Sequence, residues 1–176
     1  MIDQAGILMA QGLGIASERI QGVNDNMSQS HYHEYYEIYY LEAGERFHMV
    51  EDQLYKMEAG EFMIFPPYVM HHSYGEENIP FKRLLLYFKP EEILWPSVRD
   101  ALKEESGIYR TDIKKRQEIH RVMEDILKEQ KDPGAFHEEY DRGMLNVLLL
   151  LIAREKTAGK GSWKEQPDRR SDTLYP

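Results

Sequence analysis

A succession of short strand-forming runs, each followed by a turn signal, is the feature that most restricts the fold of this chain. Residues 35–41 read YYEIYYL and are dense in residue types that favour strands. Four further runs follow at residues 46–50, 54–57, 62–65 and 81–88. Many short strands at near-regular spacing are typical of a β-sandwich or a β-barrel. The sequence therefore predicts a mainly β unit over residues 1–90.

Two of the predicted turns have the same sequence. Residues 42–45 and 58–61 both read EAGE, and their glycines, Gly44 and Gly60, can supply the positive φ that such turns often need. A weaker turn signal lies at residues 51–53. We interpret the repeated tetrapeptide as two similar turns, because a short spacing that occurs only once does not make a solenoid repeat.

Beyond Pro90 the apolar residues change to a helical spacing. An acidic start predicts a helix over about residues 91–105, ended by Gly107. A second helix is expected to follow a cap at Thr111 or Asp112, and its apolar residues fall mostly on one face. Those residues are Ile113, Ile119, Val122, Met123, Ile126 and Leu127.

A third helix is predicted after the break at residues 132–134, over about residues 135–156, with Gly159 as a cap just past its end. Its segment 144–153 is apolar nearly all round, so we expect burial on two sides, by the barrel and by a second helix or subunit. Residues 159–176 are polar and have the composition of a linker. The expected organisation is a barrel over residues 1–90, a helical segment over 91–158 and a linker over 159–176.

Charge and composition exclude several classes of protein. The 176 residues include 22 basic and 31 acidic side chains, and the net charge of −9 disfavours nucleic-acid binding by this chain alone. With no cysteine there is no disulfide, no cysteine zinc site and no thiol nucleophile. The longest apolar run, residues 147–153, is far below the ~20 residues of a membrane span. No secretory signal is visible, so a cytoplasmic protein without membrane contact is the default expectation.

The histidines are concentrated in one region. Five of the seven lie between residues 31 and 72, and His31 and His33 fall on the same face of an extended chain. Glu37 follows four residues after His33, and His71 lies beyond a Pro-containing loop. Three imidazoles and one carboxylate are a plausible ligand set for Zn, Ni, Mn or non-haem Fe. Since four extended residues span about 13 Å, the chain must turn between His33 and Glu37 for these side chains to share one metal.

The spacing of these residues resembles that of the cupins. The metal-type positions of the first and second cupin motifs correspond to His31, His33, Glu37 and His71, and several backbone-type positions correspond to Gly44, Gly60 and Pro66. Three other positions depart from the pattern: Asp25 and Tyr68 stand where the motifs have glycine, and Gly75 stands where the second motif has asparagine. The resemblance implies a double-stranded β-helix barrel. The expected fold class is therefore mainly β, a cupin barrel followed by C-terminal α-helices.

A narrower resemblance covers residues 31–45, 54–55, 60–67 and 71, which are similar to the N-terminal sensor domain of AraC-type transcription regulators. In that family a cupin barrel binds an effector, often a sugar, and the helices after the barrel mediate dimerisation. A DNA-binding domain with two helix-turn-helix units normally follows. The resemblance implies a small-molecule effector, a homodimer, and contact with DNA only through a C-terminal domain that this chain does not contain.

The role of the histidines and of Glu37 has three interpretations. They could form a metal centre, line an effector pocket without metal, or form a structural hydrogen-bonding group. The candidate effector-binding residues are His31, His33, Tyr35, Glu37, Tyr39 and His71, of which His31, His33, Glu37 and His71 are also the candidate metal ligands. The tyrosines could stack on a sugar ring, although alternating tyrosines on a strand can also be ordinary core residues.

Two functions from different classes follow. The first is the ligand-sensing and dimerisation domain of a transcription regulator, which is not an enzyme; residues 1–21 would then act as a movable arm over the pocket. The second is a small cupin metalloenzyme of the sugar isomerase or dioxygenase type, in which a divalent metal acts as a Lewis acid. Such an enzyme would need a further general acid or base, for which only Glu34, Tyr35 and His72 are at hand. The regulator is therefore the preferred interpretation.

Overall fold

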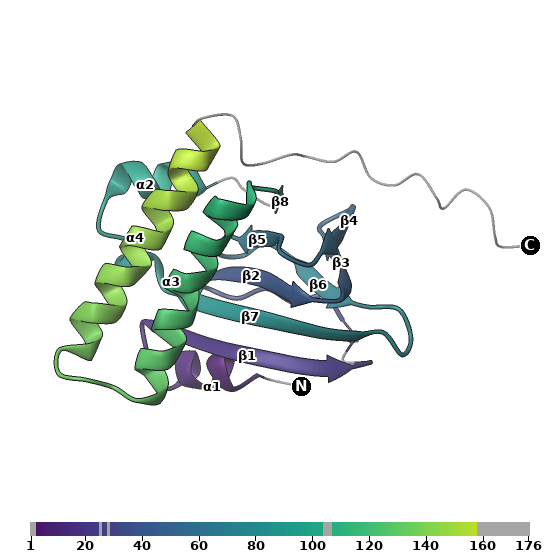
Figure 1. Ribbon diagram of the computed structural model, residues 1–176, viewed down its shortest axis with the longest axis horizontal. Coiled ribbons are helices and arrows are strands. Elements are labelled where there is room, and N and C mark those ends of the chain that lie inside the picture. Colours follow the sequence, from purple (N-terminus) through teal and green to yellow (C-terminus); the bar gives the residue numbers. More distant parts are fainter. Residues whose placement is uncertain (1–2, 25, 28, 104–106, 158–176) are drawn as a thin grey trace, which may run out of the picture.

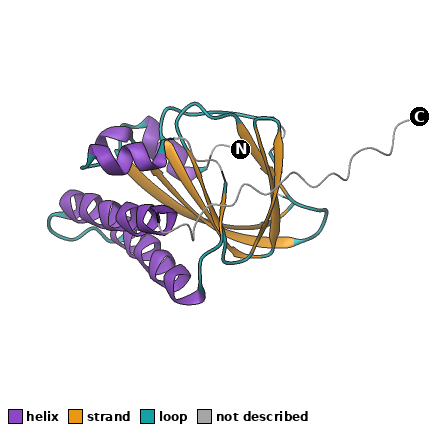
Figure 2. Ribbon diagram, turned by 90° about the horizontal axis from the view of Figure 1, so that it is seen from above, coloured by secondary structure: helices purple, strands orange, loops and turns teal. Residues whose placement is uncertain are grey.

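Two antiparallel β-sheets face each other to form a barrel, and helices cover the outer face of the larger sheet (Figures 1 and 2). The structure is a computed structural model that describes residues 3–24, 26–27, 29–103 and 107–157. The larger sheet has the order β1 (Ile15–Val23), β7 (Pro80–Phe88), β2 (Tyr36–Ala43), β5 (Phe62–Phe65) and β8 (Ile108–Tyr109). The smaller sheet has the order β4 (Gln53–Glu58), β3 (Glu45–Val50) and β6 (His71–Tyr74). The prediction of a mainly β barrel followed by helices is confirmed.

The two EAGE turns have the backbone conformation that their glycines predict. Gly44, between β2 and β3, has φ 86°, and Gly60, between β4 and β5, has φ 90°. A Cβ atom at Gly44 would lie 2.4 Å from the carbonyl oxygen of Pro80, so no other residue fits this turn without a shift of the backbone. Each turn therefore fixes where one strand ends and the next begins.

The N-terminal residues differ from the expectation of a movable arm. Residues 15–21 belong to β1, which pairs with β7 along its whole length, from Ile15 opposite Phe88 to Val23 opposite Pro80. A short helix, α1 (Gln4–Ala10), precedes β1 and buries Ala5 and Met9 against the barrel. The arm interpretation is thus wrong for β1, because a strand paired over nine residues is part of the sheet.

The helical segment begins differently from the prediction of one helix over residues 91–105. A 3₁₀ turn, η1 (Pro90–Glu92), is followed by the separate helix α2 (Pro96–Leu102). The break is at Trp95, whose extended backbone (φ −115°, ψ 123°) is the conformation that a following proline favours. β8, which was not predicted, then returns to the edge of the larger sheet beside β5. Residues 104 and 105 lie outside the described residues.

Two long helices lie across the sheet. α3 (Ile113–Lys131) begins where predicted, since the side chain of Asp112 accepts a hydrogen bond from the backbone of Lys115 at 2.9 Å. α4 (His137–Thr157) runs beside it (Figure 1). Most of the apolar segment of α4 is buried, but Val147 is 46% exposed. The expected cap at Gly159 and the expected linker lie outside the described residues. None of the described helices is long and apolar enough to cross a membrane.

The larger sheet separates two apolar cores. Alternate residues of β2 face opposite sides: Tyr36, Ile38 and Tyr40 pack in the core that contains the helices, while Tyr39 and Leu41 pack in the barrel interior. The helix-side core continues through α2, α3 and α4. The barrel interior also receives side chains from β3, β4 and α1. A side chain on the inner face of β2 is therefore shielded from solvent by both sheets.

Candidate functional site: a histidine–carboxylate cluster

His31, His33, Glu37 and His71 meet at one end of the barrel, and we call them the histidine–carboxylate cluster. Their ligand atoms all lie within 4.8 Å of one another. His31 is held by a reciprocal backbone pair with His71, in which each amide donates to the other's carbonyl oxygen at 3.0 Å. A bend at residues 34–35 brings His33 back towards the start of β2. The turn that the sequence requires between His33 and Glu37 is therefore present.

Hydrogen bonds fix the orientation of two of the imidazoles. Nδ1 of His33 lies 2.7 Å from the carbonyl oxygen of Tyr35, and Nδ1 of His71 lies 2.8 Å from that of Val69. A carbonyl oxygen only accepts, so each Nδ1 carries hydrogen and donates it. Both Nε2 atoms point at Oε2 of Glu37, at 3.0 Å from His33 and 3.2 Å from His71.

This arrangement fits a metal cation. In a neutral imidazole whose Nδ1 carries the hydrogen, Nε2 presents a lone pair, and a lone pair cannot hydrogen-bond a carboxylate. A proton or a cation must therefore lie between each Nε2 and the oxygen of Glu37. Backbone carbonyls that accept from the distal nitrogen are the usual support of metal-bound histidines. Nδ1 of the third imidazole, His31, is buried without a hydrogen-bond partner in the described part of the chain.

Electrostatics within the cluster favour a charged Glu37. Burial raises the pKa of Glu37, but hydrogen bonds from His33 and His71 outweigh it and hold this pKa well below its usual range. For His71, burial lowers the pKa, while the hydrogen bond and the charge of Glu37 reverse the effect and raise it. For His31, burial and then the neighbouring His71 lower the pKa to about 4. The cluster thus combines one carboxylate with imidazoles of different basicity.

Aromatic rings surround the cluster. Tyr35 stacks on His33 with ring centroids 4.2 Å apart, and Phe65 stacks on His71 at the same distance. Tyr87 lies 5.6 Å from His33, and its hydroxyl donates to Oδ2 of Asp3 at 2.6 Å. Phe65, Tyr87 and Asp3 were not predicted, because apolar strand residues and a distant N-cap carry no metal-site signal in the sequence.

The remaining candidate, Tyr39, lies deeper in the barrel. Its ring packs edge-on against the ring of His48 with centroids 4.4 Å apart. The sequence left the direction of His48 open; the structure buries it completely inside the barrel. Of the predicted effector-binding residues, five therefore gather at the cluster and Tyr39 lies apart, beside His48.

A second group of potential ligands lies on the other face of the sheet. Glu42 of β2 meets His120 and Glu124 of α3, with ligand atoms within 4.8 Å. A guanidinium nitrogen of Arg19 already lies 2.6 Å from Glu42 and 2.7 Å from Glu124. A guanidinium of the chain itself therefore already bridges the two carboxylates of this group, and the group differs from the histidine–carboxylate cluster in that respect.

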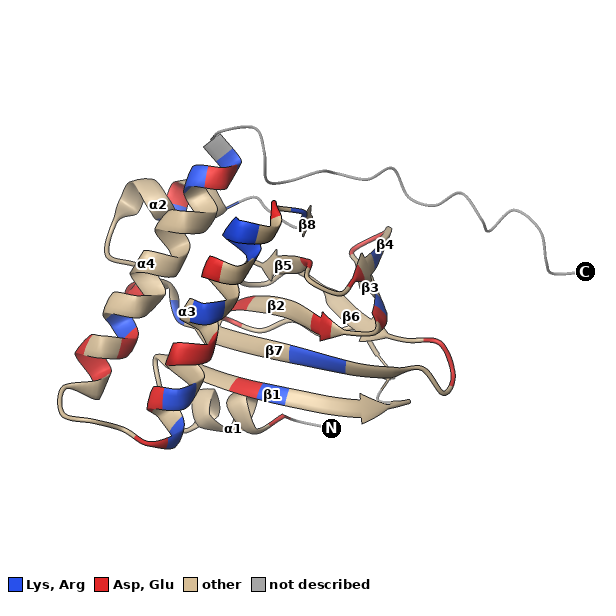
Figure 3. Cartoon of the chain, in the orientation of Figure 1, with Lys and Arg blue, Asp and Glu red and all other residues tan. Residues whose placement is uncertain are grey.

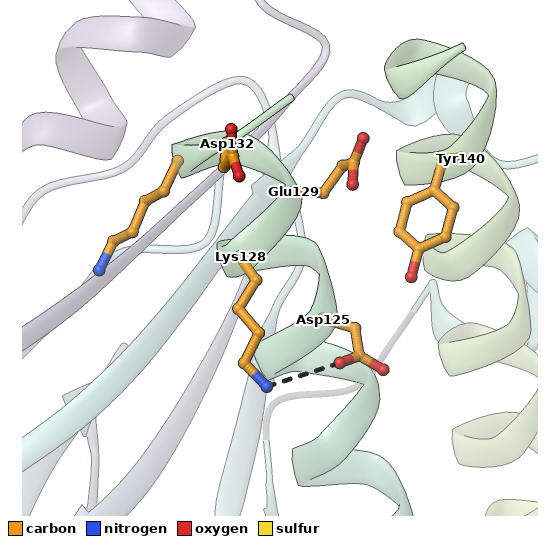
Figure 4. A pocket seen from close by; sticks show the side chains of 6 residues that line it. Asp125, Lys128, Glu129, Asp132 and Tyr140 are labelled. Atoms are coloured by element: carbon orange, nitrogen blue, oxygen red, sulfur yellow. Dashed lines mark ion pairs between the residues drawn. The ribbon is translucent and has the colours of Figure 1, made fainter. Parts of the chain in front are cut away.

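A surface hollow of about 500 Å³ lies between the end of α3 and the start of α4 (Figure 4). Its lining is polar and carries both charges, and an ion pair joins Lys128 to Asp125 at 3.8 Å. Tyr140 is the only ring among the lining residues in the described part of the chain. Ligand pockets are usually lined by apolar and aromatic side chains around a few polar groups. The surroundings of the cluster match that description better than this hollow does.

Comparison with known proteins identifies the family. The sequence profile described as the AraC-like ligand binding domain matches residues 15–150, which span both the barrel and most of the helical segment. The chain belongs to the family of AraC-like ligand-binding domains. No match is found among curated proteins.

The chain is also similar to several solved cupin structures. A cupin protein from Bacteroides fragilis is 18% identical, with a TM-score of 0.41 over 44% of this chain and 68% of the other. An RmlC-like cupin family protein with a double-stranded β-helix fold, from Methanocaldococcus jannaschii, is 17% identical, with a TM-score of 0.39 over 43% and 70%. A cupin-like protein from Thermotoga maritima is 12% identical, with a TM-score of 0.41 over 47% and 62%. Because these TM-scores are all low, the similarity to solved structures adds no evidence beyond the family match.

Proposed function

We propose that this AraC-like ligand-binding domain senses a small effector, most simply a sugar or related metabolite, at the histidine–carboxylate cluster. The observation that supports this is the convergence of three imidazoles and a carboxylate, ringed by Tyr35 and Tyr87, at one end of the barrel. Polar groups placed among aromatic rings suit a hydroxylated ligand with apolar ring faces. The protein would act in the cytoplasm and would not be an enzyme.

The residues of the cluster would hold a divalent metal through the Nε2 atoms of His33 and His71, an imidazole nitrogen of His31 and a carboxylate oxygen of Glu37. A bound metal would supply Lewis acidity towards an effector oxygen. Glu37 keeps its negative charge in the barrel, and the backbone carbonyls of Tyr35 and Val69 orient the imidazoles. Without metal, the same side chains would hydrogen-bond the effector directly.

Zinc titration of the purified, chelator-treated chain tests the metal. We expect one zinc per chain and a raised thermal midpoint, because a ligand that binds only the folded state stabilises it. His71→Gln should remove this binding. His120→Gln is the matched control, since it removes a histidine from the group whose two carboxylates Arg19 already bridges. Equal zinc binding by wild type and His71→Gln would contradict the metal site.

We further propose that the helical segment, residues 91–158, mediates dimerisation and that a C-terminal helix-turn-helix domain of the whole regulator binds DNA. A regulator that reads two DNA half-sites needs a dimer. Reading the source gene beyond the codon for Pro176 tests the second part. Two helix-turn-helix patterns with a basic surface are expected over roughly the next hundred codons; a stop codon directly after Pro176 would contradict it.

A cupin metalloenzyme of the sugar isomerase or dioxygenase type is the second candidate, and the metal-compatible tautomers of His33 and His71 favour it. Such an enzyme also needs a proton-transferring group beside the metal. Tyr87, whose ring lies 5.6 Å from that of His33 and whose hydroxyl donates to Asp3, is the candidate for such a group, and burial raises the pKa of this hydroxyl well above its ordinary value. Turnover of aldose substrates by the zinc-loaded chain, lost in Tyr87→Phe, would favour the enzyme over the regulator.

A further inference from the structure

The barrel interior is layered, and the register of the strands defines the layers. On β2, Glu37 lies opposite Tyr87 of β7, and Tyr39 lies two residues further along the strand. On β3, Val50 lies opposite His71, and His48 lies two residues further along. Two strand residues span about 6.6 Å. Tyr39 and His48 therefore form a second layer, about 6.6 Å beyond the histidine–carboxylate cluster, and they meet across the barrel with ring centroids 4.4 Å apart.

This second layer carries polar atoms that the protein does not satisfy. Three buried atoms have no hydrogen-bond partner in the described part of the chain: both ring nitrogens of His48 and the hydroxyl oxygen of Tyr39. His48 is completely buried and Tyr39 is 1% exposed. Buried polar groups without partners are rare in folded proteins, and each needs an explanation, of which a bound water, ion or ligand is one. Tyr55 provides the contrast, since it packs in the same core and its partly buried hydroxyl donates to Gln53 at 2.6 Å.

The chemistry of the two side chains selects the ligand class. Burial is the main reason that the pKa of His48 falls to about 3, so the imidazole is neutral and offers one donor and one acceptor. The hydroxyl of Tyr39 also donates and accepts. A carboxylate could satisfy only the donors, whereas a ligand hydroxyl both donates and accepts and matches the pair. The separation of the layers is close to the length of a five- or six-carbon chain.

We propose that His48 and Tyr39 are a second recognition point of the effector site, which binds the far hydroxyl groups of a five- or six-carbon sugar or polyol whose near oxygens reach the histidine–carboxylate cluster. This inference rests on the proposed function. It assigns specificity for the length of the ligand to the inner layer, because a two- or three-carbon compound can reach only the cluster.

Isothermal titration calorimetry of the chain tests the inference, with d-glucose, d-galactose, d-mannose, d-xylose and sorbitol as long probes and glycerol as the short probe. At least one long probe should bind more tightly than glycerol. Tyr39→Phe should weaken that probe about fivefold to tenfold, the effect of one lost hydrogen bond, and leave glycerol unchanged. Tyr55→Phe, the matched control, removes a hydroxyl of the same core that is already bonded to Gln53 and should leave both affinities unchanged.

His48 supplies the second pair of variants. His48→Leu removes the donor and the acceptor and should weaken the long probe, while His48→Gln keeps both and should retain more of the affinity. The inference is overturned if Tyr39→Phe and His48→Leu bind the long probe like wild type, or if no long probe binds more tightly than glycerol. In either case, a probe whose binding is lost in His71→Gln would leave the proposed function standing, and the absence of any such probe would remove both.

Discussion

At the scale of single residues, the neutral buried imidazole of His48 makes stability sensitive to acid. In the unfolded chain a histidine takes up a proton near pH 6.5, whereas in the folded chain burial lowers the pKa of His48 to about 3. Acid therefore stabilises the unfolded state. Stability from this group is fully present above about pH 6.5 and is lost as the pH falls towards 3, by up to about 1.4 kcal/mol per pH unit.

We expect His48→Leu to reduce the slope of unfolding free energy against pH over that window. Urea unfolding at pH 7, 6, 5 and 4 measures the slope. His137→Leu, which changes an exposed histidine at the start of α4, is the control and should keep the wild-type slope. Identical slopes for all three proteins would contradict the assignment.

Tyr68 shows a different effect of a single residue. It stands where the cupin motif has glycine, and its φ of 67° keeps the conformation that the glycine would have. A left-handed backbone costs an ordinary residue roughly 1–2 kcal/mol, and the Tyr68 side chain is 65% exposed, so burial offsets little of this cost. We expect Tyr68→Gly to raise the free energy of unfolding by up to about 1 kcal/mol.

Tyr32→Gly is the matched control for Tyr68→Gly. Tyr32 is 58% exposed and its ring lies 6.2 Å from that of Tyr68, so both variants lose the same ring contact. Its backbone is not left-handed, however, and glycine there only adds freedom to the unfolded chain. The free energy of unfolding, measured in urea, should rise for Tyr68→Gly and fall for Tyr32→Gly. A fall for both variants would mean that the Tyr68 backbone is not strained.

The residue scale also shows what sequence can predict about the site. The resemblance to the cupin motifs grouped His31, His33, Glu37 and His71, whereas spacing alone required a turn after His33 that the sequence does not indicate. Spacing could not place His48, since it shares its inward face of β3 with Arg46, and two polar residues on one face hide the alternation that marks an interior strand. The roles of the cluster residues stay predictions.

At the scale of elements, charged side chains join α3 to the barrel sheet. Figure 3 shows residues of both signs along α3 where it crosses the strands. Glu42 of β2 accepts hydrogen bonds from Nε and a terminal nitrogen of Arg19 at 2.8 and 2.6 Å and from Nε2 of His120 at 2.6 Å. Burial raises the pKa of Glu42, but these bonds outweigh it and lower this pKa. Glu42 is therefore the centre of the contact between helix and sheet.

Glu42→Gln should lower the free energy of unfolding by about 1–3 kcal/mol, the range for a lost hydrogen bond to a charged group. Urea unfolding at pH 7 measures the change. Glu45→Gln is the control, because Glu45 pairs with Lys56 at 2.8 Å on the solvent-exposed side of β3. Glu45→Gln should lower the free energy of unfolding much less than Glu42→Gln does. Equal decreases for the two variants would mean that the contact of Glu42 with α3 adds nothing to stability.

Elements differ in how well the sequence predicts them. The strands β2, β3, β4, β5 and β7 agree closely with the predicted runs because each is dense in apolar residues between turn signals. β1 was missed because it mixes Ser17, Glu18 and Arg19 with apolar residues, and these polar side chains have partners on α3, α1 or β7 that only the tertiary fold provides. β8 has two residues, too few for any periodicity.

At the scale of the whole molecule, the exposed apolar residues of α4 are where the proposed dimer would form. Val147 is 46% exposed on a helix most of whose apolar segment is buried, whereas the exposed Tyr140 lies in the hollow between α3 and α4. Val147→Glu should convert a dimer to a monomer in sedimentation velocity, since a buried unpaired carboxylate opposes association. Val23→Glu, at a similarly exposed valine of β1, should leave the dimer intact. A Val147→Glu dimer as tight as wild type would exclude this face of α4.

The order of strands in the larger sheet also determines how this domain can fold. Within that sheet no two neighbouring strands are consecutive along the chain, and β1 pairs with β7 over nine positions after an interval of more than fifty residues. The chain must close long loops before most of these pairings can begin, and such non-local topologies fold on timescales of about milliseconds to seconds. During synthesis on the ribosome, β1 cannot complete its pairing with β7 until Phe88 has emerged. A nascent chain released before that point would expose a nine-residue strand without its neighbour, which is a starting point for aggregation.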